Sequence, residues 1–196
     1  MPEKTNEDFK VINGIRYFAT GDVGEMLPNG NLKIIDRKKD LVKLSTGEYV
    51  SLNKVESVLK LLPFVDNCCV VAEPTKSNCV SMIVPNHKKL IEYLTSDQKK
   101  TQQLEEKLNE YDSIDEKSDE LNKMLDANSK LIEKLIKQAY DHCLKQGLDR
   151  FEIPTRLKFV KEIWTPDTGL VTDSLKLKRK ELERFYKSEI DMLYKY

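Results

Sequence analysis

The sequence predicts an α+β fold, in which a small, mixed, three-stranded sheet packs with about three helices behind an N-terminal β-hairpin. The main observation is an alternation of patterns: short apolar runs bounded by Gly, Pro and Asn are followed by segments whose apolar residues recur at helical spacing. The chain has 196 residues, which is enough for one domain of ordinary size plus an extension. Strands interleaved with helices predict two packed layers.

The N-terminal region carries the signals of short strands and tight turns. Residues 1–14 are polar and predict irregular structure, whereas Ile15–Phe18 predicts a strand that leads into Thr-Gly-Asp. Residues 28–31 form a turn signal, because Pro, Asn and Gly favour turn conformations. Residues 32–36 and 41–44 then predict two short strands on either side of a charged bend.

The central region predicts the sheet and its first helices. Ser51 is a suitable N-cap for an amphipathic helix, which Pro63 ends. Residues 65–74 and 77–85 are largely apolar, so they predict two buried strands separated by a turn. His87–Leu94 predicts a further helix.

Residues 95–130 differ from the rest of the chain in composition. They contain no Gly or Pro and many charged residues, so we expect a low-complexity helical insertion that is exposed to solvent. On this interpretation, deletion of residues 97–128 leaves function nearly intact. The alternative is a partner-binding coiled coil, although Asp115 and Ser118 interrupt its seam. Its near-heptad positions are Leu104, Leu108, Tyr111, Leu121 and Leu125.

The C-terminal region predicts the last strand and its flanking helices. Residues 131–140 have the pattern of an amphipathic helix, which Gly147 can close. Residues 157–160 predict a third buried strand, and residues 174–196 predict a helical segment that is basic at its start.

The composition excludes several classes of function. The 33 basic and 33 acidic side chains give a formal net charge of zero, so we expect no nucleic-acid partner. The N-terminus lacks the apolar core of a signal peptide, and no run approaches the roughly 20 apolar residues of a membrane span. Because Cys68, Cys69, Cys79 and Cys143 lack metal-site spacing, we expect them to be buried and reduced.

Two residues of the N-terminal region have the chemistry of a ribose site. Asp22 follows a strand and a Gly, so both of its carboxylate oxygens can accept hydrogen bonds from paired hydroxyls. Arg37 lies at the charged bend and offers forked donors that match sugar or phosphate oxygens. Each of these residues alone is also typical of a solvated turn, so the candidate site depends on their combination.

Three motifs together resemble those of the adenylate-forming enzymes, and especially of the long-chain acyl-CoA synthetases. They are "YFATGD" at residues 17–22, "IIDRKKDLVKLSTGEYVS" at residues 34–51 and "LKLKRKEL" at residues 175–182. The resemblance covers residues 1–95 and 130–190, which is the whole chain apart from the insertion.

This resemblance implies a domain organisation and a reaction. Residues 1–36 would be the end of a large N-terminal domain and its linker, and residues 37–196 a mobile C-terminal domain with the insertion at 95–130. Members of the family use ATP to convert a carboxylic acid into an acyl-adenylate and then transfer the acyl group to coenzyme A. The small domain rotates between the two steps. Asp22 and Arg37 would hold the ribose of ATP.

The same resemblance assigns roles to the charged bend and to the turn that follows it. Lys39 occupies the hinge position, about which the small domain rotates. Gly47 corresponds to the hairpin that passes the pantetheine channel in the thioester-forming state, where a side chain would crowd the thiol. Thr46 and Glu48 flank it on this coenzyme A side.

A late lysine is implied as the catalytic residue of adenylation. Matching the family's Lys-x-x-Arg pattern selects Lys176 with Arg179, and Lys178 and Lys180 are the alternatives. The family often has Gly where this chain has Leu175. A long ammonium side chain suits the role, because the reaction brings two anions together.

The implied partners are the chain's own N-terminal large domain, a fatty acid, ATP and coenzyme A. Mg²⁺ is expected in the full-length enzyme but not on this chain, and the fragment is expected to be soluble and inactive alone. The resemblance places the full-length protein in the cytoplasm or on the cytosolic face of the endoplasmic reticulum, and leaves peripheral membrane association open. The alternative function is a non-catalytic interaction module that uses residues 95–130. A phosphate-binding loop in the sequence upstream of Met1 would favour the enzyme over the interaction module.

Overall fold

The computed structural model describes residues 5, 8–94, 106, 114–126 and 129–195. These residues form several small sheets and a set of helices, so the predicted α+β class is confirmed. The central feature is a mixed three-stranded sheet of β7 (Val65–Ala72), β8 (Cys79–Pro85) and β9 (Arg156–Phe159). Strand β7 pairs with β8 in antiparallel orientation, and β8 pairs with β9 in parallel orientation.

Three two-stranded hairpins precede this sheet. They pair β1 (Phe9–Ile12) with β2 (Ile15–Phe18), β3 (Asp22–Met26) with β4 (Leu32–Arg37), and β5 (Leu41–Lys43) with β6 (Tyr49–Ser51). The prediction of irregular structure for residues 1–14 is therefore wrong at β1. A turn at Asn13 and Gly14, both with positive φ, returns the chain so that β1 can pair with β2.

The parallel pairing of β8 with β9 requires a crossover connection, which helices provide. The crossover contains α3 (His87–Leu94), α5 (Ile114–Asp126) and α6 (Ser129–Lys145). Helix α6 ends as predicted at Gly147, whose φ of 82° allows the Leu148 amide to donate to the Cys143 carbonyl at 3.1 Å.

The remaining helices flank the crossover in sequence. Helix α2 (Leu52–Leu59) begins as predicted at Ser51, whose hydroxyl accepts a hydrogen bond from the Lys54 amide at 3.2 Å. The C-terminal segment forms two helices, α7 (Arg179–Phe185) and α8 (Lys187–Leu193). No helix among the residues that the structure describes is long and apolar enough to cross a membrane.

Helices cover both faces of the three-stranded sheet, so the prediction of two layers is wrong. Alternate residues of each strand point to opposite faces. Val70 and Ile83 belong to a core that includes residues of α2, α3, α5 and α6. Val71 and Met82 belong to a second core with residues of α7 and α8. Every residue of β8 is buried, as expected for a central strand between two helical layers.

Helix α5 belongs to the first core and is not a solvated appendage. Leu121 and Leu125 are each only 1% exposed and lie in the same core as β7 and β8. The expectation that the insertion is exposed is therefore wrong for this helix, and deletion of residues 97–128 would remove two core side chains. A partner-binding coiled coil cannot use these two leucines while they are buried. Its other positions, Leu104, Leu108 and Tyr111, lie outside the described residues.

The four cysteines are buried and free, as predicted. Burial raises the pKa of the Cys69 and Cys79 thiols to about 12, and that of Cys143 to about 11. Burial raises the pKa of Cys68 as well. These thiols behave as small apolar side chains.

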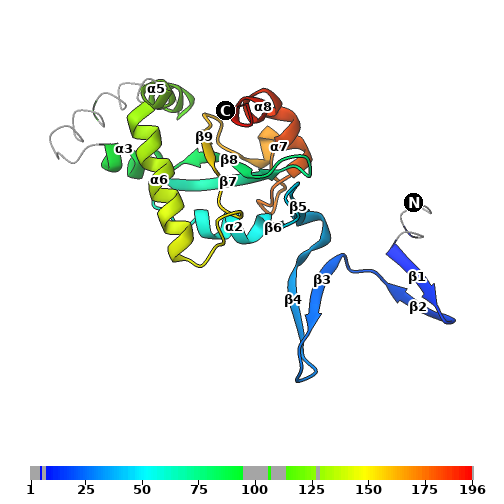
Figure 1. Ribbon diagram of the computed structural model, residues 1–196. Helices are drawn as coiled ribbons and strands as arrows, with labels where there is room; N and C mark the ends of the chain where they lie inside the picture. The colour runs from blue at the N-terminus through cyan, green and yellow to red at the C-terminus, as the bar shows by residue number, and fades with distance from the viewer. Residues whose placement is uncertain (1–4, 6–7, 95–105, 107–113, 127–128, 196) are drawn as a thin grey trace.

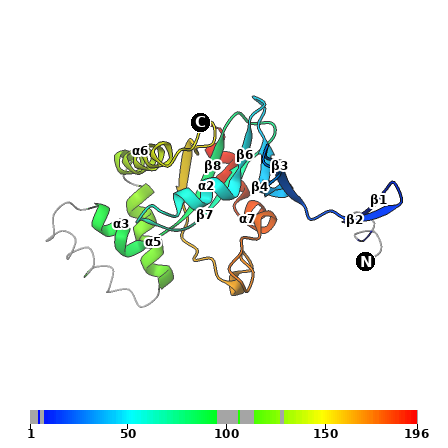
Figure 2. The same cartoon turned by 90° about the horizontal axis from the view of Figure 1, so that it is seen from below.

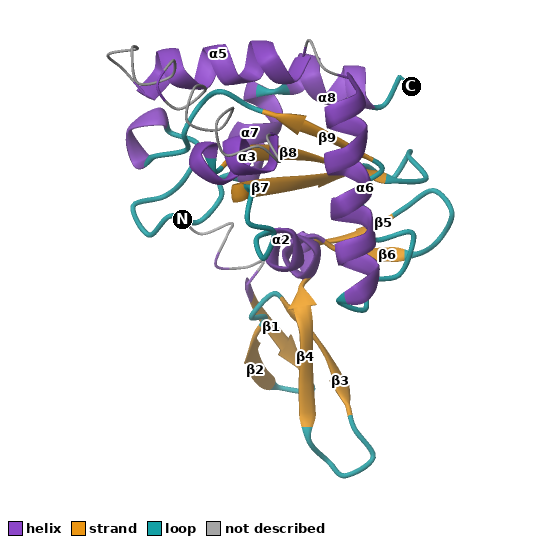
Figure 3. Cartoon of the chain, turned by 90° about the vertical axis from the view of Figure 1, so that its left-hand side faces the viewer, coloured by secondary structure: helices purple, strands orange, loops and turns teal. Residues whose placement is uncertain are grey.

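The first two hairpins lie apart from this packed structure. Figures 1 and 2 show β1 and β2 at the opposite end of the molecule from α3 and α6. Figure 3 shows β3 and β4 on one side of α2 and the three-stranded sheet on the other. Large apolar side chains of both hairpins are exposed, including Val11 at 71% and Ile34 at 57%. We refer to residues 9–37 as the N-terminal hairpins and to the described residues of 41–195 as the packed region.

Candidate functional site

Asp22 and Arg37, predicted to bind the same ribose, lie directly opposite each other on β3 and β4. Arg37 Nε is 3.6 Å from Asp22 Oδ1. Gly21, with φ of 80°, makes the sharp turn before β3, and its carbonyl accepts from the Lys38 amide at 2.8 Å. The Asp22 amide also donates to the Thr20 hydroxyl at 3.2 Å. The motif therefore folds into a local frame that fixes the carboxylate beside the guanidinium.

The pair is accessible to a ligand. The Arg37 side chain is 61% exposed and the Asp22 side chain 33% exposed, so an ion pair between them contributes little to stability. The carboxylate keeps acceptor positions for two neighbouring hydroxyls, and the guanidinium keeps donors for oxygens of the same ligand. This arrangement suits a ribose.

The charged bend forms a single turn of 3-10 helix, Lys38–Asp40 (η1), which joins β4 to β5. The side chains of Lys38 and Lys39 are exposed, whereas Asp40 is only 8% exposed. Lys39 therefore lies between a hairpin with little core of its own and a residue that is bonded to the packed region. This is a suitable place for a hinge, because few contacts resist a change of backbone torsions there.

A buried arginine connects Asp40 with the packed region. Arg179, at the start of α7, has a side chain that is 15% exposed. Its Nε donates to Asp40 Oδ1 at 2.9 Å, and its two terminal nitrogens donate to Glu56 at 2.6 and 2.9 Å. Burial opposes the charge, but the contacts with Glu56 and Asp40 outweigh it and raise the pKa of Arg179. The sequence identified Arg179 only as the end of a motif, and no local pattern indicated these distant partners.

Asp36, just before the bend, is also held by the packed region. Its carboxylate accepts hydrogen bonds from the Ser51 hydroxyl and from Asn53 Nδ2, the latter at 3.1 Å. The Arg37 amide donates to it at 2.7 Å. Burial works against ionisation of Asp36, but these hydrogen bonds outweigh it and hold the pKa below its usual range. Both ends of the bend are thus bonded to the packed region.

The turn at Thr46–Glu48 closes the hairpin of β5 and β6. The Gly47 amide donates to the Leu44 carbonyl at 3.0 Å, and Gly47 has φ of 104°, which strains any residue with a side chain. The space beside it is open. The hydrogen bond from the Thr46 side chain holds the pKa of exposed Glu48 below its usual range.

Lys176 lies on a tight turn, which an isolated antiparallel bridge between Val171 and Leu177 closes. The Thr172 amide donates to the Lys176 carbonyl at 2.8 Å, and the Thr172 hydroxyl accepts from the Lys176 amide at 3.1 Å. Leu175 has φ of 59°, a left-handed conformation that glycine adopts more easily than leucine. The turn presents an exposed Lys176 side chain.

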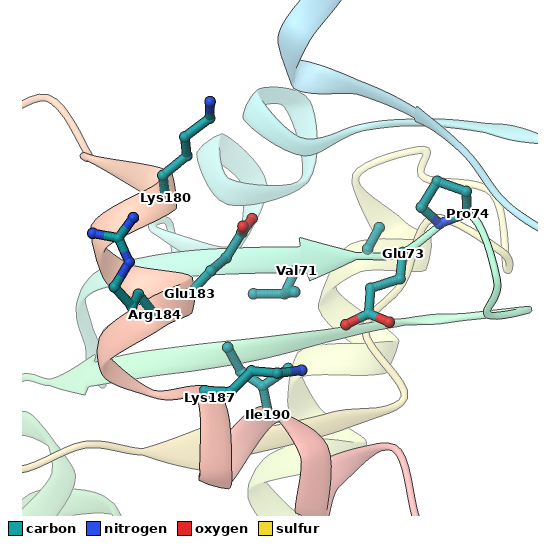
Figure 4. A pocket seen from close by; sticks show the side chains of 9 residues that line it. Val71, Glu73, Pro74, Lys180, Glu183, Arg184, Lys187 and Ile190 are labelled. Carbon is teal, nitrogen blue, oxygen red and sulfur yellow. The ribbon is translucent and has the colours of Figure 1, made fainter.

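The alternative lysines occupy different surroundings. Lys178 precedes α7, and its amide donates to the Leu170 carbonyl at 3.0 Å. Lys180 lines a surface depression of about 500 Å³ between α7, α8 and the end of β7. Figure 4 shows Glu183 reaching from α7 toward the side of the depression that carries Glu73, whereas the Lys180 side chain points away from Glu73. Partial burial there, together with repulsion from Glu73, raises the pKa of Glu183. Apart from Lys180, none of the predicted site residues lines this depression.

The structure thus brings some predicted residues together and keeps others apart. Asp22 pairs with Arg37, whereas the ammonium of Lys176 makes no hydrogen bond or ion pair within the described part of the chain. Among the described residues, no hydrogen bond or ion pair joins the Gly47 turn to the Asp22–Arg37 pair. Among the described residues there is no group of three or more His, Cys, Asp or Glu side chains that could hold a metal ion.

Similar proteins were found by sequence and by structure, although no family model matches the chain. It is 39% identical over 98% of its length to long chain acyl-CoA synthetase 8 of Arabidopsis thaliana. It is 40% identical over 91% of its length to long-chain-fatty-acid–CoA ligase 1 of Saccharomyces cerevisiae. The chain spans 24% of the length of each of these two proteins.

The fold matches solved adenylation domains. The adenylation domain of a carboxylate reductase from Mycobacterium chelonae superposes on all of this chain with a TM-score of 0.73 at 25% identity, over 25% of its own length. The corresponding domain from Segniliparus rugosus, solved with AMP and a carboxylic acid, covers 98% of this chain and 25% of its own length, with a TM-score of 0.72 and 22% identity. The chain belongs to the long-chain acyl-CoA synthetases, a family of adenylate-forming enzymes, and corresponds to about a quarter of such a protein.

Proposed function

We propose that the chain is the C-terminal part of a long-chain fatty acid–CoA ligase and contributes to both of its half-reactions. The observation that carries this proposal is the exposed Asp22–Arg37 pair, 3.6 Å apart on neighbouring strands. It lies in a chain that is 39% identical over nearly its whole length to a long chain acyl-CoA synthetase. The domain boundary would fall near the bend, with residues 1–36 on the side of the large domain and residues 37–196 on the mobile side.

In the first half-reaction, the carboxylate of the fatty acid attacks the α-phosphorus of ATP, and the bond to pyrophosphate breaks. The Asp22 carboxylate would accept hydrogen bonds from the ribose hydroxyls while Arg37 donates to nearby oxygens. Lys176 would reach the reacting groups from its exposed turn, where its ammonium offsets the negative charge of the attacking carboxylate and the phosphate. A lysine with no partner among the residues that the structure describes is free to do so after domain closure.

In the second half-reaction, the thiolate of coenzyme A attacks the acyl-adenylate, and AMP leaves. Rotation about Lys39 would replace the Lys176 turn by the Thr46–Glu48 turn at the active site. Gly47 supports this role because the space beside its α-carbon is open, so the pantetheine arm can pass without meeting a side chain.

The N-terminal hairpins support a large domain as the chain's main partner. Their exposed apolar residues, such as Val11, Phe18, Met26 and Ile34, have no core within the described structure that could bury them. Exposed apolar patches of this kind mark interaction surfaces. The large domain would bury them and would also supply the fatty-acid site and most of the ATP site. Mg²⁺ would accompany ATP there. Peripheral association with the cytosolic face of the endoplasmic reticulum would likewise depend on the large domain.

The proposal is tested with a ligase that contains this chain and its large domain. Long-chain fatty acid, ATP and coenzyme A should give AMP, pyrophosphate and acyl-CoA in equal amounts. Asp22→Ala should raise the KM for ATP about tenfold or more, because hydrogen bonds to a charged group are lost. Glu25→Ala, on the same strand, serves as the control and should leave this KM unchanged. Release of ADP and phosphate, or ATP consumption independent of fatty acid, would contradict the proposal.

A further inference from the structure

Arg179 stands out as a buried charge whose contacts reach both sides of the bend. On one side it binds Asp40, the residue that follows Lys39. On the other side its Nη2 donates to Asn53 Oδ1 at 3.0 Å, and Asn53 Nδ2 in turn donates to Asp36 at 3.1 Å. A single asparagine can do this because its side chain carries both an acceptor and a donor.

The same arginine lies close to Lys176 in the chain. Arg179 is three positions after Lys176, which is at most about 11 Å of extended backbone. The turn that carries Lys176 is closed by the bridge of Val171 with Leu177 and by the hydrogen bonds between Thr172 and Lys176, so its closing strand leads directly into Arg179. A fixed guanidinium therefore fixes the base of this turn.

We propose that Arg179 is a positioning residue for adenylation, which holds the Lys176 turn in a defined place relative to both ends of the hinge, Asp40 directly and Asp36 through Asn53. This inference rests on the proposed function, because it gives Lys176 and the hinge their roles. Glu56 has a supporting part: its two oxygens hold both terminal nitrogens of Arg179, so the guanidinium has one orientation. Lysine could not replace this fork, since a single ammonium cannot reach three acceptors in a plane.

Two substitutions separate this network from the general stability of the fold. Arg179→Lys keeps the charge but loses the fork. Asn53→Asp is nearly isosteric and exposed, keeps an acceptor for Arg179, and places a second carboxylate against Asp36. Arg184→Lys is the matched control on the same helix, because Arg184 is exposed and pairs only with Glu181 in the described structure.

The first measurement uses the chain alone and does not depend on activity. Spin labels at Lys33→Cys on β4 and Ser174→Cys in the turn report the distance between the hairpin and the turn. Because the native cysteines are buried, the label should react with the two introduced cysteines. We expect one narrow distance distribution for the parent chain and for Arg184→Lys. Asn53→Asp and Arg179→Lys should lose this narrow peak. A narrow peak in both variants would overturn the proposal.

The second measurement uses the complete ligase. Arg179→Lys and Asn53→Asp should lower kcat for adenylation by about ten- to a hundredfold with a smaller change in the KM for ATP, because a misplaced group loses effective molarity. Transfer from supplied acyl-adenylate to coenzyme A should fall much less. Equal losses in both steps would show that Arg179 is only structural. If Lys176→Ala were harmless, the proposed function of Lys176 would fail, and the distance measurement would still decide whether Arg179 holds the turn.

Discussion

The N-terminal hairpins and the packed region differ in how far they bury their apolar side chains. In the packed region, helices cover both faces of the three-stranded sheet, and the buried residues form two cores. In the N-terminal hairpins, residues such as Val11 and Ile34 remain exposed. The first region can stabilise itself, whereas the second resembles one half of an interface.

The bend lies between these two regions, and this explains why it suits a hinge. Asp36 and Asp40, at its two ends, are bonded to the packed region, while Lys38 and Lys39 between them are exposed. Only a few hydrogen bonds would have to change for the hairpins to take another orientation. The comparison predicts which substitutions affect chemistry, which affect domain orientation and which affect stability.

The largest effect is expected for Lys176→Ala in the complete ligase. Adenylation should slow by about 10²–10³-fold, because the substitution removes charge stabilisation that the transition state needs more than the ground state does. Transfer from supplied acyl-adenylate should change far less. Assays of the two half-reactions measure this difference, with Lys178→Ala and Lys180→Ala as controls. Normal adenylation in Lys176→Ala would move the role to one of the other lysines.

At the boundary between the regions, Lys39→Pro should separate the half-reactions in the opposite sense. Proline fixes φ near −65° and removes a backbone donor, so it should favour one orientation of the small domain. Fatty-acid-dependent pyrophosphate exchange should persist, while transfer of preformed acyl-adenylate to coenzyme A collapses. Lys39→Ala is the control and should cost little. If Ala were as damaging as Pro in both assays, the side chain would matter more than the backbone, and the hinge assignment would be abandoned.

Stability should distinguish the two regions directly. Leu125→Ala removes a buried side chain of α5 from the packed region and should lower the free energy of unfolding by about 2–5 kcal/mol. Ile34→Ala removes a side chain of similar size that is exposed in the hairpins, so the change should stay within about 0.5 kcal/mol. Urea denaturation of the chain measures both values. A small effect of Leu125→Ala would mean that α5 is dispensable after all.

Leu175→Gly should have the smallest effect. Relief of the left-handed φ at this position is worth about 1–2 kcal/mol, but the greater freedom of glycine in the unfolded chain offsets about 0.5–1 kcal/mol of it. We therefore expect a slight increase in the melting temperature. Leu175→Ala is the matched control, because alanine loses the side chain and keeps the strain. Equal melting temperatures for the two variants would show that the turn is not strained.

Local patterns were sufficient to predict much of the fold. Ser51 and Gly147 mark helix ends through their own chemistry, and the apolar runs of β7 and β8 indicate burial without any tertiary information. The prediction of irregular structure for residues 1–14 is wrong because most of this segment is polar, and Phe9–Ile12 becomes a strand only by pairing with β2. The leucines of α5 were misjudged because their periodicity does not say which surface they contact.

The candidate site was predictable only where the motifs are local. Asp22 and Arg37 are candidates because of their chemistry, and their direct pairing follows from the hairpin that joins them. The partners of Arg179 were not predictable, because Asp40 and Glu56 lie more than a hundred residues away in the chain and meet it only after the sheet has formed.

The central claim is that the hairpins and the packed region are one part of an active site, completed by a large domain. It is tested most directly by fatty-acid-dependent exchange of radiolabelled pyrophosphate into ATP, measured for the chain alone and for the ligase that contains it. We expect no exchange with the chain alone, because the proposal assigns the sites for the fatty acid and the phosphates to the large domain, and rapid exchange with the complete ligase. Fatty-acid-dependent exchange by the 196-residue chain alone would contradict the account.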